Sequence, residues 1–158
     1  MFSLTILNTR EIKKIKEMLQ YDFGFFPEED YAYLQNEKDK IFVVRKEVAH
    51  LDLKKLIVDK IGLYFGELKD TQLRLSKEGA QLLALAAEKK GKKLKNVVTL
   101  SAAEIKEYFQ GMDVVRDLGP ESKLLLLQYN QEILGCSPYK EGKILNFLPK
   151  AHRGEVIL

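Results

Sequence analysis

Cationic side chains gather near the C-terminal end of the chain, where they could bind phosphate groups. Lys150, His152 and Arg153 directly follow Pro149, which would stop a preceding strand because proline has no N–H to donate. A basic cluster on the rigid edge of a sheet is typical of a site for a polyanion. A denser run, residues 89–95, contains the lysines Lys89, Lys90, Lys92, Lys93 and Lys95.

The charge of the chain is unevenly distributed. The net charge is only +3, but residues 89–158 carry 12 Lys and Arg against 8 Asp and Glu, whereas residues 1–88 carry 14 against 15. This asymmetry predicts that the C-terminal part is the one that faces an anion. Ordinary solvated lysines are the alternative explanation for such a run.

Few residues could do covalent or metal chemistry. Cys136 and His152 could form a nucleophile and its base, but nothing near Cys136 in the sequence would activate the thiol. The only other histidine is His50. The pair Gly62 and Gly66 lacks the Lys-Ser/Thr that completes a phosphate-binding loop. We therefore expect no catalytic residue, no cofactor and no metal site.

The composition is that of a folded, water-soluble protein. Of the 158 residues, 46% are hydrophobic and 31% charged, and no stretch approaches the roughly 18 consecutive apolar residues of a membrane span. The single cysteine excludes an internal disulfide. We expect a cytoplasmic protein that does not bind membranes.

The N-terminal part, residues 1–91, is predicted to be a small α+β domain. Asn8 and Glu11 form a capping-box pattern for a helix whose inward stripe contains Ile15 and Leu19 and which ends at Gly24. A further helix is expected to start after Ser76 and to end at Gly91. The remaining predicted elements are strands at 31–34, 41–45, 63–65 and 72–75 and a helix at 50–60.

The C-terminal part, residues 92–158, is predicted to form a small β pseudo-barrel with one helix across its end. The helix starts at the capping box Ser101–Glu104 and closes at Gly111. Its aromatic residues Tyr108 and Phe109 could stack on bases, although at least one is expected in the core. The predicted strands are 96–100, 112–115, 124–127, 133–136 and 143–148, and the last three form a meander with tight turns at 130–131 and 141–142.

Several residues of this part follow a recognisable order. Tyr108-Phe109-Gln110-Gly111 is followed by strands with Gly135 and then by LNFLPKAHR, residues 145–153. The order resembles a PUA domain, and in particular the PUA-like tail of NOL/NOP/Sun-type RNA cytosine methyltransferases. The upstream segment 62–84 resembles the piece that precedes the PUA domain in those enzymes and in a two-domain ribosome-biogenesis family with a pre-PUA domain.

The resemblance implies RNA binding and not methyl transfer. The cofactor-binding unit and catalytic cysteines of those enzymes have no counterpart in these residues, and Leu145 replaces the usual lysine, with Lys143 two positions away. RNA contacts are implied at Asn146, Lys150 and Arg153. Together with the charge pattern, the expected RNA-binding residues are Lys92, Lys93, Lys95, Gly111, Lys143, Asn146, Lys150, His152 and Arg153.

The sequence thus predicts a non-catalytic RNA-binding protein that acts on rRNA or tRNA in ribosome biogenesis or RNA modification. An RNA-modifying enzyme or a pre-ribosomal protein is a possible partner. The alternative is an accessory subunit that docks on an RNA methyltransferase or pre-ribosomal protein and has weak RNA affinity of its own. An enzyme with an unrecognised site ranks third.

Overall fold

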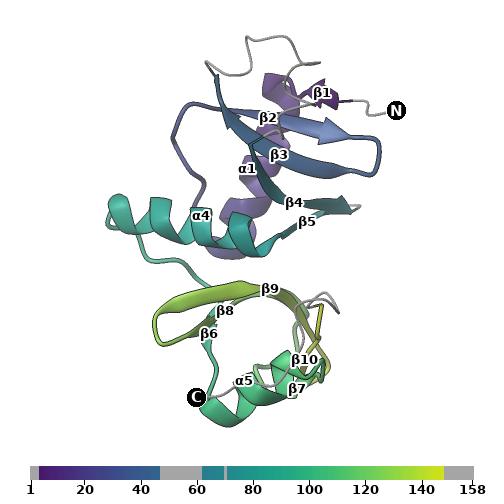
Figure 1. Ribbon diagram of the computed structural model, residues 1–158, viewed down its shortest axis with the longest axis vertical. Coiled ribbons are helices and arrows are strands. Elements are labelled where there is room, and N and C mark those ends of the chain that lie inside the picture. The colour runs from purple at the N-terminus through teal and green to yellow at the C-terminus, as the bar shows by residue number, and fades with distance from the viewer. Residues whose placement is uncertain (1–3, 47–61, 70, 148–158) are drawn as a thin grey trace.

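A computed structural model describes residues 4–46, 62–69 and 71–147, which form two five-stranded sheets and three helices. The sheets follow one another along the chain and lie one above the other in Figure 1. The predicted fold class, a small α+β part followed by a PUA-like pseudo-barrel, is confirmed. The predicted helix at 50–60 lies outside the described residues.

The first sheet is antiparallel, with its strands in chain order. Its strand β4 is longer than predicted, because the chain passes Gly66 through a bulge: Ile41 pairs with Gly66, whereas Phe42 pairs with Tyr64. The elements of this part are β1 (Leu4–Ile6), α1 (Thr9–Phe23), β2 (Tyr31–Asn36), β3 (Lys40–Arg45), β4 (Leu63–Lys69), β5 (Gln72–Leu75) and α4 (Lys77–Lys89).

Helix α1 begins and ends as predicted. The Asn8 side chain accepts a hydrogen bond from the Glu11 N–H, and the Glu11 side chain accepts one from the Asn8 N–H. Gly24, at φ +77°, forms the C-cap, a left-handed conformation that favours glycine. The stripe Ile15 and Leu19 is buried, so this face of α1 packs in the core.

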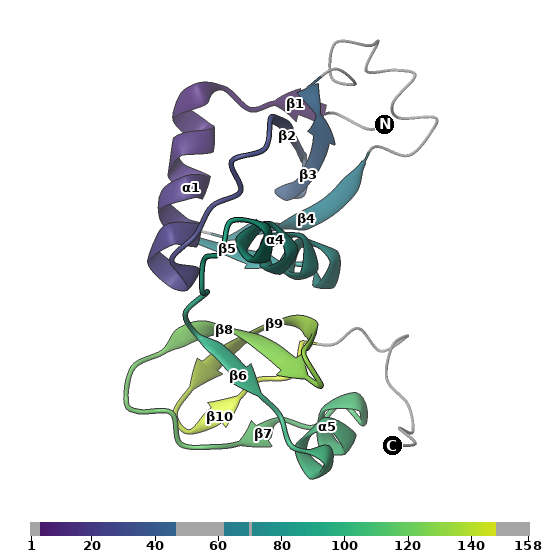
Figure 2. The ribbon, with the colours of Figure 1, turned by 90° about the vertical axis from the view of Figure 1, so that its left-hand side faces the viewer.

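The second sheet has the strand order β6-β8-β9-β10-β7 and is antiparallel except for the pair β6 and β8. It curls into a half-barrel with α5 at one end (Figures 1 and 2). The predicted turns have positive φ at Asn130, Gln131, Glu141 and Gly142, as two-residue hairpin turns require. The elements are β6 (Val97–Thr99), α5 (Ala102–Phe109), β7 (Val114–Val115), β8 (Lys123–Tyr129), β9 (Glu132–Lys140) and β10 (Lys143–Ile144).

The prediction of a strand over residues 143–148 is wrong in its extent, because β10 ends at Ile144. Past that point the backbone N–H of Asn146 donates to the Asp113 carboxylate, 2.8 Å away, instead of continuing a ladder. The chain therefore leaves the sheet two residues after β10.

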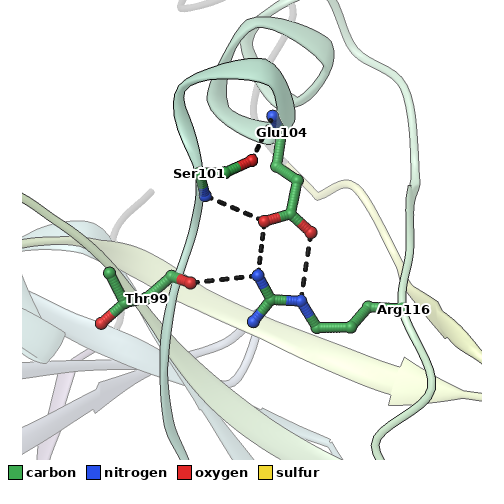
Figure 3. A network of polar contacts seen from close by, with 4 residues as sticks. All are labelled: Thr99, Ser101, Glu104 and Arg116. Carbon is green, nitrogen blue, oxygen red and sulfur yellow. Dashed lines mark hydrogen bonds and ion pairs between the residues drawn. The ribbon is translucent and has the colours of Figure 1, made fainter.

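An ion pair between Arg116, which follows β7, and Glu104 of α5 belongs to a network that also reaches the end of β6 and so closes the half-barrel (Figure 3). Arg116 donates to both carboxylate oxygens of Glu104 and, through Nη2, to the Thr99 carbonyl oxygen at 3.2 Å. Glu104 also accepts from the Ser101 N–H at 2.9 Å, in the predicted capping box. Burial acts to raise the pKa of Glu104, but the hydrogen bonds from Ser101 and Arg116 outweigh it and lower the pKa.

Removing this ion pair is expected to destabilise the half-barrel. Arg116→Ala should reduce the free energy of unfolding by about 1–3 kcal/mol, the usual effect of losing hydrogen bonds to a charged group. Because the pKa of Glu104 is lowered on folding, this contribution is present above the unfolded pKa of glutamate and is lost as pH falls through the folded one. In urea unfolding, the difference in free energy of unfolding between Arg116→Ala and the parent protein should therefore be smaller at acidic pH than at neutral pH. An equal difference at both pH values would contradict the role assigned to the ion pair.

One hydrophobic core lies between the two sheets, and a second fills the half-barrel. Leu124 and Leu126 on β8 pack with buried residues of α1, α4 and β5, whereas Leu125 and Leu127 point into the half-barrel. Strand β8 is therefore buried on both faces, which explains its unbroken apolar run. Gln81 of α4 also donates to the carbonyl oxygen at residue 133 of β9, at 3.1 Å. The division predicted after residue 91 lies between α4 and β6 and stays a prediction.

Candidate nucleic-acid interface

The junction lysines, Lys92, Lys93 and Lys95, lie in the segment that links α4 to β6, and all three are exposed. The backbone of this segment is held at both ends. The Lys92 N–H donates to the Ala87 carbonyl oxygen at 2.9 Å, and the Lys95 N–H to that of Phe23 at 3.0 Å. Lys92 and Lys93 form no ion pair with any residue that the structure describes, so both charges are available to an anion.

Lys95 differs from its two neighbours because it lies against the end of α1. Its Nζ is 5.7 Å from the centroid of the Tyr21 ring, and its charge acts on Asp22. Burial raises the pKa of Asp22, and the positive charge of Lys95 opposes part of that rise. Lys95 therefore joins the linker to α1 and offers less free charge than Lys92 or Lys93.

A second group of predicted residues lies at the C-terminal end of α5. Gly111 follows the helix at φ +92°, where a side chain would be strained. The Asn146 Nδ2 donates to the carbonyl oxygens of Tyr108, at 2.7 Å, and of Met112, at 2.8 Å. These bonds are made on either side of Gly111 in the chain and connect the end of α5 to the segment after β10. Asn146 thus holds this turn in shape, and its predicted contact with RNA stays a prediction.

Lys143 is exposed on β10, three residues before Asn146. Its cross-strand neighbours are Lys140 on β9 and Val115 on β7. Val115 is 74% exposed, so this row of the barrel surface combines two cations with an apolar side chain.

The predicted site residues do not form one cluster. The linker with the junction lysines lies at the end of the half-barrel next to α1 and α4, whereas α5, with Gly111 and Asn146, lies at the opposite end (Figures 1 and 2). Lys150, His152 and Arg153 lie outside the described residues. The structure therefore brings Gly111 to Asn146 and separates both from the junction lysines.

Tyr108 lies in the core, as was expected of at least one of Tyr108 and Phe109, whereas the exposed Tyr21 was not singled out in the sequence. Tyr108 is only 3% exposed and its ring packs edge-on against Phe109, with 5.7 Å between the centroids, so it offers no face to a base. Tyr21, in contrast, is 81% exposed. Its position off the stripe of Ile15 and Leu19 signals exposure, but its closeness to Lys95 follows only from the fold.

The thiol of Cys136 is a core group. Burial raises its pKa to about 12, so the thiol stays protonated at neutral pH and is a poor nucleophile. No group of three His, Cys, Asp or Glu side chains within the described ranges could hold a metal ion. None of the helices in those ranges is long and apolar enough to cross a membrane.

Comparison with known families agrees with this geometry. Residues 95–153 match the family model described as the Methyltransferase RsmF PUA domain. The match supports the prediction of a PUA domain, which corresponds to the curled sheet with α5. The match covers less than half of the chain, and the likeness of the upstream part to a pre-PUA domain stays a prediction. A search of curated proteins gives no match.

Proposed function

We propose that the protein binds RNA through its PUA domain and the adjoining junction lysines and that it does not itself catalyse a reaction. The observation that carries the proposal is the PUA match over residues 95–153, which begins at one of the exposed lysines. The buried, protonated thiol of Cys136 supports the second part of the proposal.

The junction lysines suit contact with phosphate. A lysine that neutralises a phosphate releases a condensed counterion, and this release drives association at low salt. Backbone hydrogen bonds at Lys92 and Lys95 hold the segment in place. A pre-ordered backbone reduces the entropy lost on binding, so the two unpaired cations can engage RNA at a low ordering cost.

The RNA in this proposal is rRNA or tRNA, bound in the cytoplasm during ribosome assembly or RNA modification. Support comes from the matching family model, which describes the PUA domain of a methyltransferase, and from the resemblance of residues 145–153 to the tail of RNA cytosine methyltransferases. Such a protein would work beside an RNA-modifying enzyme or a pre-ribosomal protein.

A second candidate, an accessory subunit with weak RNA affinity, is favoured by apolar side chains on the barrel surface. Val115 and Met112 are both exposed large hydrophobic residues, and they belong to the β7 region at the α5 end. A protein that used this surface would bind a partner protein in preference to RNA.

The proposal predicts that affinity for structured RNA falls steeply with salt. Each phosphate neutralised adds roughly 0.7–0.9 to the slope of log affinity against log salt. The double variant Lys92→Ala/Lys93→Ala should therefore bind a fluorescein-labelled RNA hairpin more weakly and with a slope smaller by about 1.4–1.8. Anisotropy titrations over a series of salt concentrations measure both quantities.

The matched control removes the same charge elsewhere. Lys13→Ala/Lys14→Ala changes two lysines in the first half of α1, away from the linker, and should leave the slope close to that of the parent protein. An affinity that ignores salt would contradict the proposal, and equal slopes for the two double variants would exclude the junction lysines as phosphate contacts.

A further inference from the structure

Tyr21 is a large aromatic side chain that the core does not use. It lies in the last turns of α1 and is 81% exposed, whereas the helix buries Ile15, Leu19 and Phe23. The Lys95 ammonium lies 5.7 Å from its ring centroid, within the range of a cation–π contact. An exposed ring beside cations is the combination with which proteins bind unpaired nucleotides, by stacking and charge together.

Several contacts fix this ring relative to the junction lysines. The Lys95 N–H donates to the Phe23 carbonyl oxygen, and the Asn96 side-chain amide donates to that of Asp22. The methylenes of Lys95 lie over Gly24, where an added Cβ would be 3.6 Å from Lys95 Cγ. The end of α1 and the linker therefore form one rigid surface.

The spacing suits a nucleotide and its flanking phosphates. Lys93 is two residues from Lys95, so their Cα atoms lie within about 7 Å of each other. One nucleotide and one extended lysine side chain have comparable lengths. If a base stacked on the Tyr21 ring, the phosphates next to that base would therefore lie within reach of the linker. The backbone at Lys93 thus lies close to that of Lys95, whose side chain is next to the ring.

Two acidic groups near this surface are offset by lysines. Asp22 is partly buried and lies next to Lys95, and Glu28 is paired with Lys90 at 3.6 Å. Glu88 is exposed in the last turn of α4. Lys92 and Lys93 carry no such counter-charge among the described residues.

We propose that Tyr21 stacks on an unpaired base of the bound RNA while Lys92 and Lys93 contact the adjoining phosphates. This proposal rests on the proposed RNA binding and adds a substrate class to it, namely RNA with a single-stranded segment next to a folded one. Stacking on an aromatic side chain contributes enough that Tyr21→Ala should weaken binding of such RNA by roughly 5- to 140-fold. Tyr21→Phe, which keeps the ring, should bind nearly as the parent does.

The chain contains no tryptophan, so Tyr21→Trp places a single fluorescent reporter at the proposed site. The probes are an RNA hairpin with an unpaired oligoadenosine tail and the same hairpin without the tail. A stacked base quenches indole fluorescence, so the tailed hairpin should quench Trp at position 21 more strongly than the blunt one. The control Ile6→Trp places the reporter at an exposed residue of β1, where neither hairpin should quench.

Anisotropy titrations with the same RNAs test the stacking proposal separately from the proposed RNA binding. If both hairpins bind but quench Trp at position 21 no more than Trp at position 6, the stacking proposal is overturned while the proposed RNA binding stands. If neither hairpin binds the parent protein at low salt, the stacking proposal and the proposed RNA binding are both contradicted. Stronger quenching by the tailed hairpin, with weaker binding by Tyr21→Ala but not by Tyr21→Phe, is the result we expect.

Discussion

Replacing Gly79 with alanine is expected to destabilise the protein by about 2–3 kcal/mol, although alanine is the better helix former. Gly79 lies in the first turn of α4, where the helix packs directly on β4. A Cβ built on it would lie 1.9 Å from the Phe65 carbonyl oxygen and 2.8 Å from the Phe65 carbonyl carbon. The gain in helix propensity is only about 1 kcal/mol, so the steric clash decides the sign.

The backbone at Phe65 has little room to move away. Its carbonyl oxygen accepts a hydrogen bond from the Ser76 N–H at 2.9 Å, the Phe65 side chain is fully buried, and the strand bulges at this point. Because α4 also packs against the second sheet, a shift of the helix would disturb the core that both sheets share.

Urea unfolding of Gly79→Ala measures this effect, and Leu85→Ala on the same helix is the control. Leu85 is exposed, so its truncation should change the free energy of unfolding by less than about 1 kcal/mol. A Gly79→Ala protein as stable as the parent would show that α4 does not approach β4 as closely as described.

The second large effect is expected at Asn146. In Asn146→Asp, a carboxylate takes the place of the amide that donates to the carbonyl oxygens of Tyr108 and Met112, so two hydrogen bonds are replaced by repulsion between oxygens. Leaving such groups unpaired costs about 1–3 kcal/mol each when they are buried. Since Asn146 is half-buried, we expect a total loss of about 2–4 kcal/mol. Lowering the pH should restore part of the lost free energy of unfolding, because a protonated carboxyl can donate one hydrogen bond.

Thermal and urea unfolding at neutral and acidic pH test this prediction, with Lys143→Ala as a control on the exposed side of the same segment. If Asn146 served only as an RNA ligand, Asn146→Asp would melt like the parent protein and differ only in RNA affinity. An unchanged unfolding curve would therefore contradict the structural role assigned to its side chain.

The elements that the sequence predicted well are those fixed by local interactions. The capping boxes at Asn8 and Ser101 depend on residues three positions apart, and the hairpin turn at 130–131 depends on two adjacent residues. The apolar run of β8 indicated a buried strand for the same reason. Which groups cover its two faces could not be predicted, because α1 and α4 lie far from β8 in the sequence.

The candidate site also depends on contacts between distant residues, which could not be predicted from the sequence. The lysine run marked Lys92 and Lys93 through composition alone, but the sequence could not show that Lys95 turns toward Tyr21, 74 positions away. The bond between the Asn146 side chain and the end of α5 also joins distant segments, and the Asn146 N–H donates to Asp113 where the alternating pattern predicted that the strand would continue. Arg116 gave no local signal, because its partners Glu104 and Thr99 lie across the closed edge of the half-barrel.

Crosslinking in living cells, followed by sequencing of the RNA recovered with the protein, tests the central claim most directly. We expect crosslinked rRNA or tRNA fragments, with the yield strongly reduced by Lys92→Ala/Lys93→Ala and little changed by Lys13→Ala/Lys14→Ala. Recovery of partner proteins with no RNA above the level of a non-crosslinked sample would contradict RNA binding and favour the accessory-subunit alternative.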